Sequence, residues 1–353
     1  MANIMVNEVC NLACPYCFAD KYVNGDTTTD ITYKNFKKCV DWINHSSDVA
    51  GDSGRRIALI GGEPTLHHQF LDLLNYAVLN RRPHQDIVVF TNGILAGDYA
   101  EYFSKNDISL LINLNSPEDI GENKYNKVLK SIDTLRKKGV SFTVGINLYR
   151  DMDFSFLTNI VKEYSFKSVR LGLICPNTPE RKQEGTSSYF EKIRPVFVRL
   201  LEELAVLGCS ANLDCQKMPF CYLKEDMDRI QEIQEKSGVV FDIFDHAKCV
   251  PVIDILTDLS LVRCFGVSDR KYAVPMEAFD TESDAEAFFT TQFDNLCSFL
   301  PAEAKCVETA CEYIYQGKCQ GGCLAYKMDQ YDSLKVALQC AITPGRVSVN
   351  LDE

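Results

Sequence analysis

The sequence predicts an α/β fold: a partial (β/α)6 TIM-like barrel followed by a smaller cysteine-rich domain. Short apolar runs alternate with helix patterns through the first half of the chain, which is typical of a parallel sheet covered by helices. Beyond about residue 210 the helix periodicity weakens and cysteines recur. A length of 353 residues, 46% of them hydrophobic, is enough for one large domain and a smaller one.

Six short apolar runs predict buried parallel strands at 4–6, 57–60, 86–91, 108–114, 142–148 and 167–174. Helix patterns between them cover residues 32–44, 71–79 and 125–138, with apolar side chains on one face. The functional end of a parallel barrel is formed by the carboxyl ends of its strands. We therefore expect the chemistry to lie where these runs stop.

A longer helix is expected after the sixth strand. Ser188 and Glu191 have the spacing of a capping box, which predicts a helix from there through Leu207. Gly208 would stop this helix, and Pro195 predicts a kink inside it. A further polar helix pattern covers 224–236. The predicted boundaries are 1–209 for the barrel, 210–248 for a bridging region and 249–353 for the cysteine-rich domain.

Composition excludes several classes of protein. A formal net charge of −12 argues against general nucleic-acid binding, which needs a basic surface. The chain has no apolar run long enough to span a membrane, and it begins without the features of a signal peptide. Sixteen cysteines in a chain of this kind point to metal ligation in a reducing cytoplasm rather than to disulfides.

Three cysteines follow the first predicted strand. Cys10, Cys14 and Cys17 are spaced C-x3-C-x2-C, and three thiolates can hold three corners of a four-iron cluster while one iron stays open to a ligand. Zinc ligation or unrelated packing residues are the alternatives. A Gly-Gly-Glu-Pro turn, residues 61–64, follows the second strand. Its glycines permit a close backbone approach, and its glutamate supplies an acceptor.

The cysteine loop and this turn together resemble the radical S-adenosylmethionine (radical SAM) family over about residues 1–205. The resemblance implies a [4Fe-4S] cluster on Cys10, Cys14 and Cys17, whose open iron chelates SAM and whose electron releases a 5′-deoxyadenosyl radical. It also implies cofactor-binding positions beside the triad and at the strand ends. These are Tyr16, Phe18, Gly61, Gly62, Glu63, Pro64, Thr91, Asn113, Asn115, Asn147 and Arg170.

Some of these positions have plain structural alternatives. Thr91 opens a T-N-G segment that could be an ordinary strand-ending turn. Arg170 could pair with the SAM carboxylate or form a surface ion pair. His67 and His68 are expected at a solvated helix start. Four further cysteines are expected as buried apolar residues rather than ligands, namely Cys39, Cys175, Cys209 and Cys297.

A second set of seven cysteines occupies the last third of the chain: Cys249, Cys264, Cys306, Cys311, Cys319, Cys323 and Cys340. Chain with little apolar periodicity can obtain folding free energy from metal ligation. Two four-thiolate sites would need eight ligands, so one is missing from this set. One or two zinc ions, or one cluster alone, are the alternatives.

The segment from Cys319 to Cys323 resembles the SPASM extension of peptide-modifying radical SAM enzymes, which carries two auxiliary [4Fe-4S] clusters. The resemblance assigns the first cluster to Cys249, Cys264 and Cys323. It assigns the second to Cys306, Cys311, Cys319 and Cys340. The spacings depart from the family pattern, since four and seven residues separate Cys306, Cys311 and Cys319 where two and five are usual, and Leu259 replaces a usual glycine. The fourth ligand of the first cluster is Cys221, Cys215 or none.

These resemblances imply an enzyme that abstracts hydrogen from a ribosomally synthesised peptide and forms a thioether or carbon–carbon crosslink. The alternatives are protein oxidation of the anaerobic sulfatase-maturase kind, oxidation of a small alcohol, and a non-enzymatic iron–sulfur electron carrier. A flavodoxin- or ferredoxin-type electron donor is implied. We expect no leader-binding domain before the first strand, so a leader would be bound by the barrel, by the SPASM-like region or by a separate protein, or the substrate would carry no leader. The proton acceptor stays open among Asp214, Tyr222 and Asp254.

Overall fold

The computed structural model describes residues 2–20, 22–23, 25, 28–51, 55–174, 186–214, 218–243, 249–294, 311–316, 319 and 322–330. Its strands are β1 Ala2–Met5, β2 Ile57–Ile60, β3 Ile87–Thr91, β4 Ile108–Asn113, β5 Phe142–Leu148, β6 Ser168–Leu173, β7 Ser210–Leu213, β8 Phe241–Asp242, β9 Ile253–Ile255, β10 Ser260–Val262 and β11 Val274–Pro275.

The described α-helices are α1 Tyr33–Ala50, α2 Phe70–Asn80, α3 Ala100–Lys105, α4 Pro117–Ile120, α5 Glu122–Lys137, α6 Ser155–Tyr164, α7 Thr186–Val206, α8 Phe220–Leu223, α9 Met227–Ser237, α10 Glu282–Phe289, α13 Glu312–Tyr315 and α14 Leu324–Gln330. Among the described residues, none of these helices combines the length and the apolar character that crossing a membrane requires.

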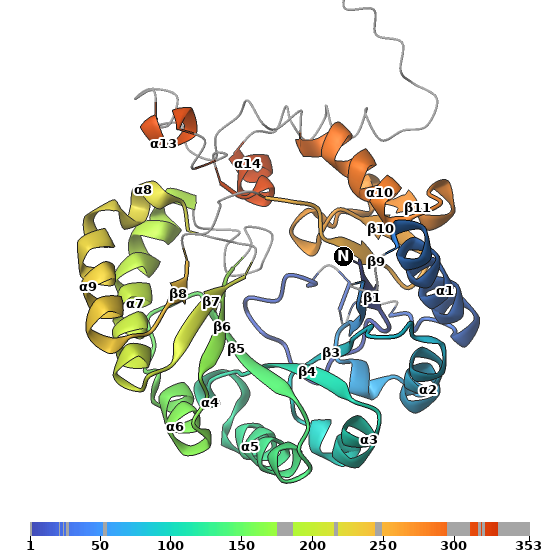
Figure 1. Cartoon of the computed structure of the whole chain (residues 1–353), viewed down its shortest axis with the longest axis horizontal. Helices are drawn as coiled ribbons and strands as arrows, with labels where there is room; N and C mark the ends of the chain where they lie inside the picture. Colours follow the sequence, from blue (N-terminus) through green and yellow to red (C-terminus); the bar gives the residue numbers. More distant parts are fainter. Residues whose placement is uncertain are drawn as a thin grey trace, which may run out of the picture.

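All the strands belong to one sheet, in the order β11-β10-β9-β1-β2-β3-β4-β5-β6-β7-β8. Pairing is parallel from β9 through β1 to β8, and β10 pairs antiparallel with β9 and β11. The sheet curls around a central space, with the helices from α1 to α9 on its outside (Figure 1). The predicted fold class, an incomplete parallel barrel, is confirmed.

The six predicted strands are present, and β2 and β5 match their predicted bounds to the residue. The parallel sheet nevertheless continues beyond them. β7 and β8 lie in the region expected to be a bridge, and β9 adds a parallel neighbour on the far side of β1. These strands are two to four residues long, which is too short for a continuous apolar run to identify them.

Helix ends follow local chemistry in α1 but not in α7. Thr32 caps α1 by accepting the amide of Asn35, and Gly51 ends it in the left-handed region. The capping box predicted at Ser188 and Glu191 is wrong, because both residues lie inside α7, which already includes Thr186. The isolated four-residue spacing does not show whether helical chain precedes it.

The two faces of the sheet bury different groups of side chains. Outward-facing strand residues such as Ile4 and Leu59 pack with helix residues such as Phe36 and Leu73 in the main core. A smaller cluster lies on the other face and consists of Met5, Ala19, Tyr22, Ile60, Leu256, Val262 and Phe265. Cys17 and Phe18 pack against this cluster. The loop that carries Cys10, Cys14 and Cys17 thus packs inside the barrel at the ends of β1 and β2.

A buried hydrogen bond joins the two halves of the sequence within the sheet. Asn3 of β1 donates from Nδ2 to Oδ1 of Asp254 on β9, over 2.7 Å. Burial raises the pKa of Asp254 to about 7, because a carboxylate enclosed in protein loses its hydration. Asp254 was one of the candidate proton acceptors, and its position is the interior face of the β1–β9 pair.

Candidate functional site

The three N-terminal cysteines lie on the loop that follows β1. The loop turns tightly, since the amide of Cys17 donates to the carbonyl of Cys14 over 3.1 Å. Lys124 of α5 donates from Nζ to the carbonyl of Asn11 over 2.9 Å and fixes the loop from outside. All three cysteines are partly buried. The loop therefore presents its thiols at the carboxyl end of the barrel strands.

The thiols of this triad are costly to ionise in the bare protein. Burial, with a smaller contribution from neighbouring thiols, raises the pKa of Cys14 to about 12 and that of Cys17 to about 11. Thiolates in such a position need a compensating positive charge, which metal ions supply. The site is thus chemically suited to bind metal and poorly suited to hold free thiolates.

The spacing of the triad disfavours a single zinc ion. Thiolates around one tetrahedral zinc lie about 3.8 Å apart, given a Zn–S distance of about 2.3 Å. The three sulfurs of the triad do not all lie within 4.8 Å of one another. Among the described residues, the one group of three His, Cys, Asp or Glu side chains whose ligand atoms are that close together is Asp30, His67 and His68. Wider separation fits a cluster, in which each thiolate binds a different iron.

The Asp30–His67–His68 group is itself a poor metal site. His67 is buried, so the prediction of a solvated helix start is wrong for this residue. Its Nε2 hydrogen-bonds the carbonyl of Ile31 over 3.0 Å, and its Nδ1 accepts the amide of Gln69 over 3.0 Å. Both ring nitrogens are therefore engaged. His68 is exposed and pairs with Asp30 at 3.0 Å.

The Gly-Gly turn packs directly against the backbone that leads into the triad. The amide of Gly62 donates to the carbonyl of Asn7 over 2.9 Å, and the amide of Glu63 donates to the carbonyl of Val9 over 2.8 Å. A Cβ atom at Gly62 would lie 2.3 Å from the Val9 oxygen, and one at Gly61 would lie 2.4 Å from Oδ1 of Asn7. The close approach expected of these glycines is, in this structure, an approach to residues 7–9.

Glu63 is a buried hub of hydrogen bonds. Its Oε1 accepts from the amide of Thr65 (3.2 Å), the Thr65 hydroxyl (2.6 Å) and the Thr91 hydroxyl (2.8 Å), and its Oε2 accepts from the amide of Asn92 (2.7 Å). Protein donors thus saturate Oε1, whereas Oε2 accepts one hydrogen bond and has room for a second. Pro64 is buried at the start of the following turn. A direct bond from the Glu63 carboxylate to SAM stays a prediction.

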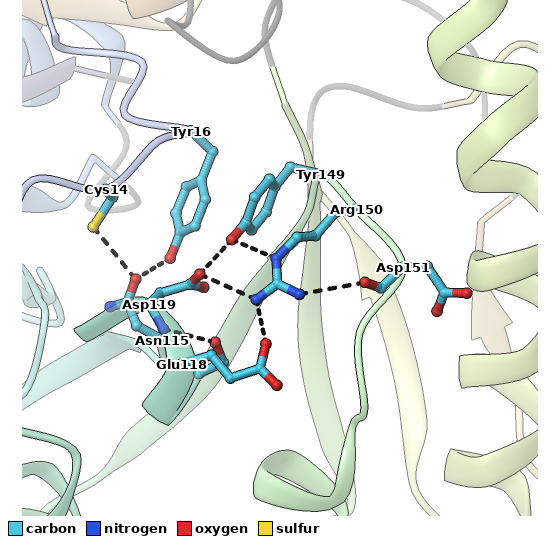
Figure 2. A network of polar contacts seen from close by, with 9 residues as sticks. Cys14, Tyr16, Asn115, Glu118, Asp119, Tyr149, Arg150 and Asp151 are labelled. Carbon is cyan, nitrogen blue, oxygen red and sulfur yellow. Dashed lines mark hydrogen bonds and ion pairs between the residues drawn. The ribbon is translucent and has the colours of Figure 1, made fainter. Parts of the chain in front are cut away.

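Asn115 connects the triad to the fourth and fifth strands (Figure 2). Its Oδ1 accepts from the Tyr16 hydroxyl and from the Cys14 thiol, the latter over 3.4 Å. Its Nδ2 donates to the carbonyl of Asn113 over 3.1 Å, and Asn147 donates to Oδ1 of Asn113 over 2.8 Å. The structure thus brings four predicted SAM-contacting residues together beside one cysteine.

A neighbouring cluster was not predicted from the sequence. The Tyr149 ring lies 5.0 Å from the Tyr16 ring, and its hydroxyl donates to Asp119. Arg150 donates to the Tyr149 hydroxyl over 2.9 Å and to Glu118 over 2.7 Å, as Figure 2 shows. A Tyr-Arg pair directly after a predicted strand was the available signal, because that is where a barrel places its functional residues.

Two other predicted positions make different contacts. Arg170 on β6 forms an ion pair with Asp214, and both side chains are largely buried. An ion pair was the alternative to a SAM contact for this residue. Phe18 lies 5.1 Å from Phe265, ring centre to ring centre.

The candidate proton acceptor Tyr222 is buried, and its ring centre lies 5.0 Å from that of Phe190. Cys39 and Cys209 are fully buried, as expected, whereas Cys175 and Cys297 lie outside the described residues.

Part of the second cysteine set is described. Arg263, itself buried, places Nη1 3.8 Å from Sγ of Cys264 and donates from Nη2 to the carbonyl of Cys249 over 3.2 Å. Burial raises the pKa of Cys264 to about 11, and Arg263 acts in the opposite direction. Helix α14, which follows Cys323, lies against the turn that follows Cys264. These contacts bring the candidate ligands of the first auxiliary cluster into one region of the fold.

The remaining candidate ligands are placed only in part. Cys221 lies on α8 and is partly buried. Cys311 precedes α13, and the amide of Cys319 donates to the carbonyl of Tyr313 over 3.0 Å. Cys215, Cys306 and Cys340 lie outside the described residues. The predicted ligand sets of the two auxiliary clusters therefore stay predictions.

Comparison with known proteins agrees with the triad. Residues 4–156 match the family model of the radical SAM superfamily. The structure is similar to native anSMEcpe with bound AdoMet, with 17% identity, a TM-score of 0.62 and coverage of 95% of this chain and 96% of that chain. It is also similar to Streptococcus suis SuiB bound to precursor peptide SuiA, with 14% identity, a TM-score of 0.64 and coverage of 94% and 73%. A further match is native anSMEcpe with bound AdoMet and Kp18Cys peptide, at 16% identity, a TM-score of 0.62 and coverage of 96% and 97%. At these identities the likeness concerns the fold.

Replacing Gly62 by alanine should destabilise the folded protein by about 1–3 kcal/mol, because the new methyl group meets backbone that cannot move without opening the loop. Urea denaturation measures the loss. Gly25→Ala is the matched control, since nothing lies within 4 Å of the added Cβ. Equal stability of the two variants would show that the turn and the loop are not in tight contact.

Proposed function

Because the chain carries a radical SAM domain over residues 4–156, we propose that it is an enzyme that splits SAM and uses the resulting radical to modify a ribosomally synthesised peptide. The family implies a [4Fe-4S] cluster and SAM as cofactors. The modification we propose is a thioether or carbon–carbon crosslink. The observation that carries this proposal is the cysteine triad, clamped by the Gly-Gly turn at the carboxyl ends of β1 and β2.

The residues present fit a cluster with one open iron. Cys10, Cys14 and Cys17 would hold three irons, and their spacing is wider than a single ion needs. When bound, such a cluster supplies the electron that splits SAM. The apolar cluster around Met5 and Phe265 shields the Cys17 side of the loop from water. Burial of this kind strengthens the electrostatic interactions of a site.

The polar residues beside Cys14 would orient the cofactor. Tyr16 and Tyr149 supply aromatic faces, and Asn113 and Asn147 supply amide groups on the interior face of neighbouring strands. Asp119 fixes the Tyr149 hydroxyl. We assign these groups to binding and orientation of SAM, because they converge on the same end of the barrel as the triad. The hydrogen atom would pass from a substrate carbon to the 5′ carbon of the split SAM.

Peptide substrates are supported by similarity over almost the whole chain to two proteins whose solved structures contain peptides. Native anSMEcpe has bound AdoMet and the Kp18Cys peptide, and SuiB is bound to precursor peptide SuiA. The anaerobic sulfatase maturase, anSMEcpe, also matches in length, with 96% and 97% coverage. Oxidation of a protein side chain is therefore the second candidate. A separate leader-binding protein and a flavodoxin- or ferredoxin-type donor belong to this proposal.

We assign an electron-accepting role to the C-terminal cysteine region. Forming a crosslink removes two hydrogens from the peptide: one leaves as an atom, and the other leaves as a proton and an electron. Cys249, Cys264 and Cys323 would hold a cluster that receives this electron, with Arg263 beside it. A buried guanidinium favours an anionic partner, and a thiolate-bound cluster is one.

Substitution of Cys14 should abolish SAM cleavage. Under anaerobic conditions, with reconstituted iron and a reductant, the parent protein should release 5′-deoxyadenosine and Cys14→Ala should release none above background. Chromatography of the reaction mixture measures the product. Cys39→Ala is the matched control, because Cys39 is fully buried in the core. Cleavage by Cys14→Ala at the parental rate would refute the site.

Three clusters predict about twelve irons per chain. Cys264→Ala should reduce the iron content by up to about four while SAM cleavage persists, because the first cluster does not use this thiol. Iron analysis and Mössbauer spectroscopy measure both quantities. An iron content of about four in the parent would remove the auxiliary clusters from the proposal.

A peptide substrate should transfer deuterium to the cofactor. Peptides encoded beside this gene, labelled with deuterium at the side-chain and α carbons, are incubated with the enzyme and SAM. By mass spectrometry we expect deuterated 5′-deoxyadenosine and a lighter peptide. The peptide loses three mass units for a thioether (one deuterium and the thiol hydrogen) or four for a bond between two labelled carbons. Deuterium transfer from a labelled sulfatase peptide instead, with formation of an aldehyde, would favour the second candidate.

A further inference from the structure

We propose that Asn92 donates a hydrogen bond to the Cys10 sulfur in the loaded enzyme and so raises the reduction potential of the SAM-binding cluster. Asn92 is then a positioning residue that acts through a ligand rather than on the substrate. The inference rests on the proposed function, because it requires a cluster on Cys10. It assigns a role to a residue that follows β3 and that cysteine spacing alone does not identify.

The backbone amide and both side-chain polar atoms of Asn92 have partners. Its amide donates to Oε2 of Glu63 over 2.7 Å, and its Oδ1 accepts the amide of Ile94 over 3.1 Å. Its Nδ2 donates to Oδ1 of Asn11 over 2.7 Å and lies 3.9 Å from Sγ of Cys10. The residue is 8% exposed. Hydrogen bonds at both ends of its side-chain amide favour one orientation.

The direction of the Asn92 amide follows from these partners. A flipped amide would set its NH2 group against the Ile94 N–H and its oxygen against Oδ1 of Asn11. Each contact would then join two donors or two acceptors. The NH2 group therefore stays turned toward Cys10. Asn115 differs, because its oxygen faces Cys14 and accepts from the thiol.

Two donors approach the Cys10 sulfur from different parts of the fold. The amide of Leu12 reaches Sγ of Cys10 over 3.4 Å, and Nδ2 of Asn92 approaches it over 3.9 Å from the end of β3. Both donors therefore stabilise negative charge on this sulfur, which is the form that binds iron.

Hydrogen bonds to ligand sulfurs are a recognised lever on iron–sulfur potentials. Reduction adds one negative charge to the cluster, and a donor stabilises the reduced form more than the oxidised form. Removing the donor must then make reduction harder. Glu63 fixes the backbone of Asn92, so the Gly-Gly-Glu-Pro turn reaches the cluster through this asparagine.

The test is a redox titration of the reconstituted protein, followed by electron paramagnetic resonance. The signal of the relevant cluster is the one that changes when SAM is added. In Asn92→Ser, which keeps an acceptor for Ile94, the ratio of reduced to oxidised cluster at a fixed potential should fall about tenfold. For a one-electron couple this corresponds to about 59 mV. Asn92→Asp should shift in the same direction.

Asn44→Ser is the matched control, because Asn44 is a buried asparagine of α1 that donates to the carbonyl of Asn80. Its potential should equal that of the parent. The proposal is overturned if the Asn92 variants keep the parental potential, or if they fold but hold no SAM-responsive iron. A parent protein without any SAM-responsive signal would refute the proposed function itself, before the variants are compared.

Discussion

Two backbone hydrogen bonds hold the candidate site together. They run from the amides of Gly62 and Glu63 to the carbonyls of Asn7 and Val9, and they extend the β1–β2 pairing into the cysteine loop. Because glycine has no Cβ, the turn comes close enough to make them. Leu12 and Tyr16 pack the loop into the core, and these two bonds fix its backbone against the end of β2, so together they determine where the thiols point.

Glu63 extends the same constraint sideways. A carboxylate without solvent access is expensive to bury, and the cost is offset only when its acceptor positions are filled. Thr65, Thr91 and Asn92 donate to both oxygens of this carboxylate, which joins the ends of β2 and β3. Fully satisfied buried networks favour a single arrangement. The conformation of the cysteine loop is therefore determined by its contacts with the ends of β1 and β2, not by the cysteines themselves.

The sequence was sufficient for the six central strands, because continuous apolar runs are local signals, and tight cysteine spacing is the local signal from which the triad is predicted. It was insufficient for β7, β8 and β9, whose few residues gain strand character only by pairing with an existing sheet edge. Contacts such as Tyr16 with Tyr149, or Asn92 with Cys10, join residues far apart in the chain. No local pattern encodes them. His67 shows the same limit, since its partner Ile31 lies 36 positions away.

The parallel pairing of β9 with β1 has a consequence for how the protein is made. Asn3 and Asp254 are separated by 251 positions, so the first strand leaves the ribosome long before its outer neighbour exists. Until then one edge of β1 offers unpaired backbone groups beside the nascent cysteine loop. A chain released before β9 is made would therefore expose both the thiols of the loop and an unpaired strand edge.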